Sequence, residues 1–281
     1  MPFVDSVDLP SNGVVTVATA LNVEAMTPLA TLPFGIAATA GSLSAEFSGQ
    51  VSVVDNLARV HFIYLVPSDK VERGTKAIER VARNLQIWYR NQMGNGKTFT
   101  LALPVVKVLN TPQVASWFLN NPAGDNPNYY YWNNTLNVVN SFTGSGFYQK
   151  SDIWIIYNDS AVTNNSGAGG TSGMAVLHEK DVSSVMGESD WTMCRGIGGA
   201  GHEVGHAFYL PHPPDGSNDW QTAIMGFAYG TYPNASLTEA DKTSLNSSNE
   251  DALRVGVYLK DFFTPVGGTS RPLDCSSLSA Y

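Results

Sequence analysis

The sequence predicts an α/β fold in which a mixed, twisted sheet packs against helices, preceded by a small β-rich N-terminal segment. Apolar runs of strand length alternate with stretches of helical periodicity from residue 57 onward. Residues 1–56 contain short stretches rich in Val, Thr and Gly and no helical pattern. The length of 281 residues allows for two domains. We therefore expect a β-rich module or extension at 1–56 and a larger domain at 57–281.

The composition limits the classes of partner and the compartment. Charged residues make up 14% of the chain, and its net charge is −8. A polar surface with few charges is typical of secreted proteins, so we expect an extracellular location. The negative net charge argues against nucleic acid and anionic membranes as partners. No apolar run reaches the roughly 18 residues that a membrane span requires. The sequence thus suggests a secreted protein, which we expect to be a monomer.

The larger domain opens with a strand and a helix. The first strand is predicted at 61–66. A helix is expected to follow it, with Asp69 as the N-cap and Glu72 completing a capping box. Either Gly94 or Gly96 would end this helix. Further strands are predicted at 99–109, buried on both faces, and at 152–157, 174–178 and 182–186.

A long insertion at 120–150 contains an unusual aromatic cluster, Tyr129-Tyr130-Tyr131-Trp132. Such a cluster serves either as a substrate-binding surface or as a cover for the edge of the core. The sequence leaves both interpretations open.

The chain has two cysteines, Cys194 and Cys275, which are too few for a zinc ribbon. A disulfide between them would close a loop of about 80 residues and add roughly 4–5 kcal/mol of stability in the chain-entropy model. We expect this disulfide. The alternative is a pair of buried free thiols.

The chemistry concentrates in the segment GHEVGHAFYLPHPPD at 201–215. The chain has five histidines, and His202, His206 and His212 fall within eleven residues. On a helix, His202 and His206 lie on one face and can reach one metal ion. Glu203 lies beside them and can approach a metal-bound water without being a ligand. Three imidazoles with an open fourth position are typical of a catalytic zinc site.

This segment resembles the signature of the metzincin clan of zinc endopeptidases, HExxHxxGxxH followed by a methionine-containing turn beneath the metal. Here the motif reads HEVGHAFYLPH, and Ala223-Ile224-Met225-Gly226-Phe227 resembles the turn, with Met225 as its methionine. The resemblance implies a metzincin-like domain with a backing helix and an active-site helix, hydrolysing bonds in protein or peptide substrates. Glu203 would be the general base. The ligands implied for one Zn²⁺ are His202, His206 and His212.

The sequence departs from this signature at Tyr209, which replaces the glycine that ends the active-site helix. A left-handed conformation costs a non-glycine residue about 1–2 kcal/mol. Either the turn is built differently or packing holds Tyr209 in place. If His212 missed the metal, Asp215 would be the nearest substitute ligand.

A second departure concerns the tyrosine that some metzincins carry two residues after the methionine of the turn. Phe227 occupies that position and has no hydroxyl group. Tyr229 is two residues further along, and we expect it either to help stabilise the oxyanion or simply to pack.

Other interpretations remain open. A glutamate from a second helix, Glu239 or Glu250, is an alternative third ligand, and the Asx-rich stretch 215–219 is a weak candidate for calcium. The chain could instead be a non-catalytic zinc-containing binding module, or a protease restricted to glycoproteins with Tyr129–Trp132 stacking on sugar. We expect an extended substrate to lie along a sheet edge at 174–178, with His178 either lining the cleft or serving an ordinary structural role.

Overall fold

The computed structural model describes residues 31–40, 43–52, 58–94, 96–144, 152–161, 169–171, 173–247 and 263–265. The chain divides into two compact units, Met1–Asn56 and Leu57–Tyr281, each described here by itself. In the first unit, β1 (Thr31–Ala40) and β2 (Leu43–Ser52) pair antiparallel, with Thr31 opposite Ser52. Among the described residues, no helix combines the length and apolar character needed to cross a membrane.

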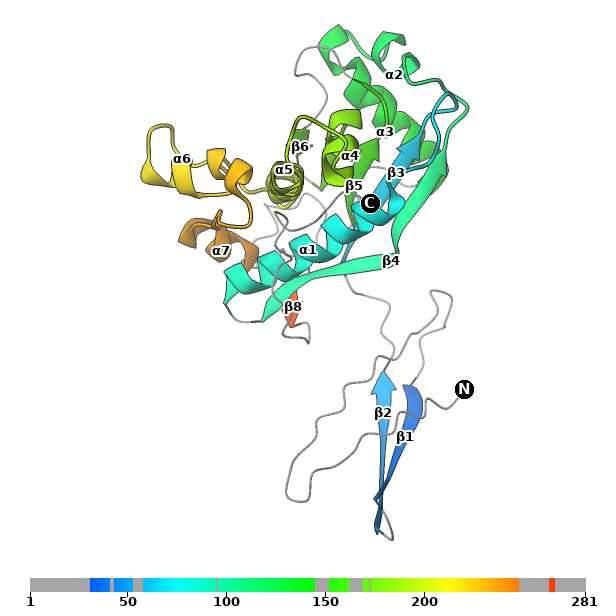
Figure 1. The fold of residues 1–281 in the computed structure, drawn as a ribbon, viewed down its shortest axis with the longest axis vertical. Coiled ribbons are helices and arrows are strands. Elements are labelled where there is room, and N and C mark those ends of the chain that lie inside the picture. Colours follow the sequence, from blue (N-terminus) through cyan, green and yellow to red (C-terminus); the bar gives the residue numbers. More distant parts are fainter. Residues whose placement is uncertain are drawn as a thin grey trace. The chain divides into compact units, whose positions relative to one another are not determined.

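The second unit is built on a mixed six-stranded sheet, as predicted (Figure 1). The strand order is β6-β7-β5-β3-β4-β8. The four central strands run parallel, whereas β6 and β8 pair antiparallel at the two ends. The strands are β3 (Arg59–Val66), β4 (Lys97–Asn110), β5 (Asp152–Asn158), β6 (Gly169–Thr171), β7 (Met174–Leu177) and β8 (Phe263–Pro265).

Helices cover both faces of this sheet, because the central strands are apolar on both sides. Along β3, Phe62 and Tyr64 join one buried cluster, while Ile63 and Leu65 join another. The first cluster includes residues of α1 (Thr75–Met93), α4 (Glu179–Met186) and α5 (Met193–Ala207). The second includes residues of α2 (Trp117–Asn120) and α3 (Tyr130–Thr143), which η1 (Pro127–Tyr129) precedes. The remaining helices are α6 (Asn218–Thr222), η2 (Phe227–Thr231) and α7 (Glu239–Leu245).

Strand β4 is less buried than its apolar sequence predicts. It pairs with β8 only through its first three residues, and beyond them the described strands leave its outer edge uncovered. Leu103 is consequently 61% exposed. The prediction of burial on both faces was therefore wrong for part of this strand.

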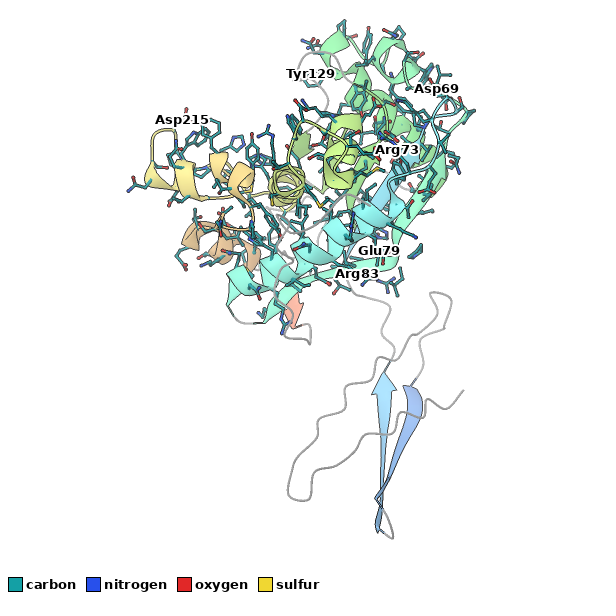
Figure 2. All side chains as sticks on the ribbon, in the orientation of Figure 1. Asp69, Arg73, Glu79, Arg83, Tyr129 and Asp215 are labelled. Atoms are coloured by element: carbon teal, nitrogen blue, oxygen red, sulfur yellow. The ribbon has the colours of Figure 1, made fainter. Side chains whose placement is uncertain are left out.

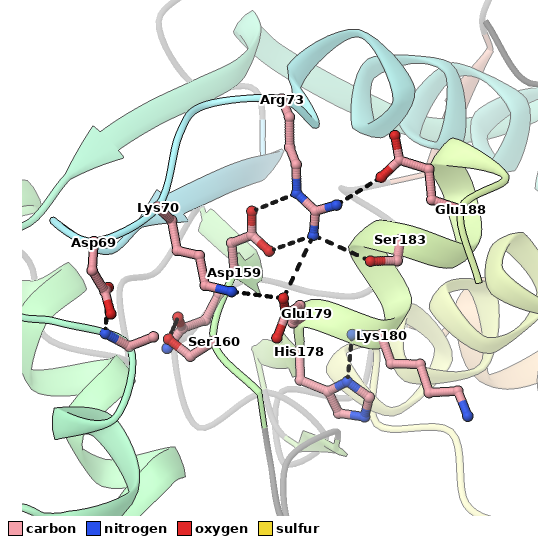
Figure 3. A network of polar contacts seen from close by, with 12 residues as sticks. Asp69, Lys70, Arg73, Asp159, Ser160, His178, Glu179, Lys180, Ser183 and Glu188 are labelled. Carbon is pink, nitrogen blue, oxygen red and sulfur yellow. Dashed lines mark hydrogen bonds and ion pairs between the residues drawn. The ribbon is translucent and has the colours of Figure 1, made fainter. Parts of the chain in front are cut away.

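Helix α1 ends as predicted and begins later than predicted. Gly94 adopts a left-handed conformation with φ 67° and terminates the helix. At the other end, the predicted N-cap Asp69 lies outside the helix and accepts a hydrogen bond from the Ala115 N–H at 2.7 Å (Figure 3). Val71, just before the helix, is 81% exposed. A contact distant in sequence thus overrides the local capping signal.

A polar network holds the segment before α1 in a non-helical conformation (Figure 3). Arg73 binds the fully buried Asp159 through two nitrogens, Nε at 3.1 Å and Nη2 at 3.0 Å. Its remaining Nη1 donates to Glu188 at 2.7 Å, and Lys70 donates to Glu179 at 2.7 Å. These bonds tie the loop between β3 and α1 to the end of β5 and to the region of α4, which packs against α5.

Residues 182–186 form part of helix α4, so the prediction of a strand there was wrong. His178 is the N-cap, and its Nδ1 accepts from the Lys180 N–H at 3.1 Å. The Asp181 carboxylate accepts from the His178 N–H at 3.0 Å and completes a capping box. Because histidine is an uncommon N-cap residue, the sequence pattern did not reveal this helix start.

Candidate metal centre

Helix α5 brings two of the predicted metal ligands onto one face. His202 and His206 are one helical turn apart, and their Nε2 atoms are separated by 3.1 Å. The helix begins at the cap residue Thr192, whose hydroxyl accepts from the Arg195 N–H at 3.2 Å. It ends at Ala207, one residue after His206, so the chain turns immediately beyond the second histidine.

His212 reaches the same point in space after this turn. Its Nε2 lies 3.0 Å from the Nε2 of His206 and 3.3 Å from that of His202. The three histidines form the one group of three or more possible ligands found among the described residues. Asp215, the predicted substitute, is not a member of this group and lies on the loop before α6 (Figure 2).

Tyr209 makes the turn by adopting the left-handed conformation, with φ 67°. Its N–H donates to the carbonyl of His206 at 2.8 Å, and the Leu210 N–H donates to that of Gly205 at 3.0 Å. The Tyr209 ring packs against the main core cluster, although its buried hydroxyl has no hydrogen-bond partner. Packing of the ring therefore holds the residue in the conformation that a glycine would adopt without strain.

Removing this unpartnered hydroxyl is expected to stabilise the protein. Tyr209→Phe keeps the packing of the ring and removes a buried polar atom that has no partner, so the free energy of unfolding should rise by about 1 kcal/mol. Tyr64→Phe is the matched control, because the Tyr64 hydroxyl donates to Asp159 at 2.7 Å and its loss leaves that carboxylate short of one donor. Thermal denaturation should show opposite shifts in Tm. Equal losses of Tm in both variants would contradict the prediction.

Backbone carbonyls fix the orientation of two imidazole rings. His202 Nδ1 lies 2.7 Å from the Ile224 carbonyl oxygen, and His206 Nδ1 lies 2.9 Å from that of Leu210. A carbonyl only accepts, so Nδ1 carries the proton and donates it in each ring. The lone pair of Nε2 is then left for a metal. Burial lowers the pKa of His202 to about 4 and also lowers the pKa of His206, so both rings are neutral at pH 7.

The geometry and chemistry of this group fit a zinc ion. Two nitrogens bound tetrahedrally to zinc at 2.0–2.1 Å would be separated by about 3.3 Å, and the three Nε2 atoms here are 3.0–3.3 Å apart. Beside them, the Glu203 Oε2 atom is buried and has no hydrogen-bond partner. Burial raises the pKa of Glu203 to about 8. A nearby cation would compensate this carboxylate and favour its ionised form.

The predicted methionine turn lies directly against the active-site helix. Met225 is completely buried, and a Cβ atom at Gly205 would overlap its sulfur. The neighbouring Ile224 provides the carbonyl that holds His202, and its own N–H donates to Ser236 at 2.8 Å. The turn therefore supports the first histidine through the backbone while its methionine fills the space beneath the helix.

Tyr229 lies beside the histidine cluster on η2. Its ring meets the His202 ring edge-on, with 5.2 Å between the ring centroids. Gly198 allows this approach, because a Cβ there would overlap the Tyr229 carbonyl oxygen. Phe227 is 57% exposed and packs at right angles to Trp220.

The sheet edge nearest the site is β6, whereas the prediction placed it at 174–178. Strand β7 pairs on both sides, with β5 and with β6, and is fully buried. Strand β6 passes close to α5: a Cβ at Gly170 would lie 2.5 Å from the Glu203 carbonyl oxygen and 2.7 Å from the His206 Cβ. Among the described strands, β6 is therefore the edge next to the histidines.

The other residues that the sequence offered as ligands or cleft residues are His178, Glu239, Glu250 and the stretch 215–219. His178 caps α4 and is 8% exposed. Glu239, an alternative third ligand, bonds Lys242 at 2.7 Å on α7, and Glu250 lies outside the described residues. The stretch proposed for calcium runs into the start of α6, and none of its acidic groups forms a metal-binding group in the part of the chain that is described.

The aromatic cluster Tyr129–Trp132 is buried at one residue and exposed at another. Tyr131 is buried in the second core cluster, which accords with a cover for the core, whereas Tyr129 is 59% exposed. The Trp132 ring lies beside β6, 3.7 Å from the position of a Cβ on Gly169.

The predicted disulfide joins Cys194 to Cys275. Cys194 lies on α5, and Cys275 is outside the described residues, so the disulfide between them stays a prediction.

Sequence reasoning missed the groups that support the site. The carbonyls of Leu210 and Ile224 leave no signature in side-chain chemistry. In the sequence, the positions of close contact appear only as the glycines Gly170, Gly198 and Gly205. The one signal is the run Gly-Ile-Gly-Gly-Ala-Gly at 196–201, which is unusual for a helix.

No protein-family profile and no curated protein matches this chain. Among solved structures, the crystal structure of archaemetzincin from Methanopyrus kandleri is similar, with 13% sequence identity and a TM-score of 0.36. The match covers 68% of this chain and 95% of the archaemetzincin chain. That protein carries the name of the clan whose signature the sequence resembles. A likeness this distant carries no argument about function, which rests instead on the side chains described above.

Proposed function

We propose that this protein is a zinc-dependent endopeptidase acting on protein or peptide substrates. The observation that carries the proposal is the convergence of His202, His206 and His212, whose Nε2 atoms lie 3.0–3.3 Å apart. Three neutral imidazoles leave one position of a tetrahedral zinc site open, which is typical of catalytic rather than structural sites. When bound, zinc would polarise the scissile carbonyl and lower the pKa of a water molecule toward 7.

Glu203 is the proposed general base. It follows His202 on α5, so its carboxylate lies beside the metal ligands without being one of them. Glu203 takes the proton of the attacking water and returns it to the leaving amine as a general acid. A binding module has no chemical use for such a carboxylate, which holds one oxygen, Oε2, buried and unpartnered beside three histidines, and this favours the enzyme over the non-catalytic alternative.

Strand β6 and Tyr229 are the proposed substrate-positioning elements. An extended peptide would pair with the outer edge of β6, next to Glu203 and His206. Tyr229, whose ring contacts His202, is proposed to stabilise the oxyanion. We also propose that the protein is secreted and monomeric. Recovery from the culture medium of the source cells and light scattering of the purified protein test these two points.

Removal of the metal tests the central proposal. We expect purified protein to contain one zinc per chain and to digest casein. Dialysis against a chelator should abolish digestion, and about one equivalent of zinc should restore it. Digestion that survives complete loss of zinc would refute the proposal. If zinc binds and casein remains intact, digestion of a heavily glycosylated mucin separates a glycoprotein-restricted enzyme from a binding module.

A further inference from the structure

Arg195, near the start of α5, is held between two aromatic rings. Its guanidinium carbon lies 4.3 Å from the centroid of the Trp191 ring and 5.4 Å from that of Tyr229. Stacking on ring faces orients a guanidinium group but uses none of the N–H donors in its plane. Because the Tyr229 ring also meets His202, the three side chains Trp191, Arg195 and Tyr229 form a continuous row ending at the proposed metal site.

The donors of Arg195 have no carboxylate partner among the described residues. No ion pair involves Arg195 in that part of the chain. Lys180, the other cation over Trp191, is already paired with Asp190 at 3.0 Å. Asp181 attracts Arg195 electrostatically, but it is buried and accepts the N–H of His178 in the cap of α4. Unlike an arginine in a structural ion pair, Arg195 therefore keeps its in-plane N–H donors available for an anionic ligand.

Arg195 shares one face of α5 with the metal ligands. The spacing of Arg195, Gly199, His202 and His206 is four, three and four residues, which places them along a single stripe of the helix. A Cβ at Gly199 would have no atom within 4 Å, so the stripe is open between the arginine and the histidines. His202 lies seven positions after Arg195 on the helix, a rise of about 10 Å.

We propose that Arg195 forms a carboxylate-binding subsite that selects substrates with a negative charge near the scissile bond. An extended peptide advances about 3.3 Å per residue, so the charge would lie roughly three residues from the bond that is cut. The carboxylate is either an acidic side chain or the C-terminus of a short peptide. This inference rests on the proposed function, and adds to it that the peptide bound beside β6 continues over the open face of α5.

Peptide binding tests the subsite without requiring cleavage. The probes are fluorescent octapeptides of casein sequence, capped at both ends, in which each position in turn carries Glu or Gln. A second pair has a free or an amidated C-terminus and distinguishes the two sources of the carboxylate. Affinities are measured by fluorescence polarisation on zinc-loaded Glu203→Gln protein. We expect one Glu peptide, or the free C-terminus, to bind about tenfold more tightly than its neutral partner, and less so at high salt.

Variants of Arg195 in the same background identify the residue responsible. Arg195→Gln should remove the preference, and Arg195→Glu should reverse it toward a peptide carrying Lys at the same position. Arg83→Glu is the control, because it changes the net charge equally from an exposed site on α1, paired with Glu79. Circular dichroism checks folding, and Arg195→Gln alone decides the outcome if Arg195→Glu is unfolded.

The failures of the two proposals are distinguishable. The subsite is refuted if no charged peptide binds more tightly than its neutral partner, or if the preference survives in Arg195→Gln. Loss of the proposed function would instead appear as wild-type protein that holds zinc and cleaves neither casein nor mucin. Binding of the charged peptides with no cleavage would retain the subsite and refute the peptidase.

Discussion

Glu203→Gln is expected to lower the rate of peptide hydrolysis by about 10²- to 10⁴-fold while the protein keeps its zinc. Gln has nearly the same shape as Glu but cannot accept the proton of the attacking water. The three histidines and the carbonyls that orient two of them are untouched, so the metal content should not change. The measurement compares kcat/KM for a fluorogenic peptide at matched zinc content.

Glu239→Gln is the matched control for this prediction. Glu239 is a glutamate on another helix, with its side chain 88% exposed, and it is the alternative third ligand that the sequence left open. We expect it to retain both wild-type activity and zinc. A loss of zinc in Glu239→Gln, or wild-type rates in Glu203→Gln, would show that the roles assigned to the two glutamates are wrong.

Gly198→Ala is expected to destabilise the protein by about 3 kcal/mol, lowering Tm by roughly 10 °C. The added methyl group would overlap the carbonyl oxygen of Tyr229 and lie 2.8 Å from the Cβ of Tyr232. Because a backbone carbonyl cannot swing aside as a flexible side chain does, η2 would have to move away from α5. The displaced Tyr229 would then lose its contact with His202, so activity should fall as well.

Gly199→Ala provides a closely matched comparison. It makes the same chemical change one residue further along α5, where an added Cβ meets no atom within 4 Å. Alanine is a better helix former than glycine, so this variant should be more stable by up to about 1 kcal/mol. Calorimetry of the two variants should give Tm shifts of opposite sign. If both variants were destabilised equally, the cause would be a general intolerance of side chains in this part of α5. The specific contact between Gly198 and η2 would then not explain the result.

The sequence was most informative where one local pattern determines both structure and chemistry. The spacing of His202, Glu203 and His206 requires only a helix to bring the three side chains together, and α5 is that helix. The apolar run at β3 needed only burial to become a central strand. The departure at Tyr209 was also visible in the sequence, which left open whether the turn is rebuilt or Tyr209 is held left-handed; the structure shows the second.

The failures had three physical causes: a distant contact, an uncommon cap residue and a very short strand. Asp69 has the pattern of an N-cap, but its carboxylate binds the N–H of Ala115, 46 residues away. The run at 182–186 is short and apolar enough for a strand, but it belongs to a helix that begins at the unusual cap residue His178. Strand β6 is three residues long and contains two glycines, so no periodicity could reveal the edge beside the site.

Helix α5 contains five glycines among its fifteen residues. Each weakens a helix by roughly 0.5–1 kcal/mol relative to alanine, so this segment would not remain helical in isolation. At four of the five, the missing side chain leaves room for a residue of another element. In order, Gly196, Gly198, Gly201 and Gly205 are contacted by Ser184, Tyr229, Ile224 and Met225. The histidines therefore align only after α4, the methionine turn and η2 have docked. The proposed proteolytic activity would accordingly arise late in folding, and a nascent or damaged chain would lack it.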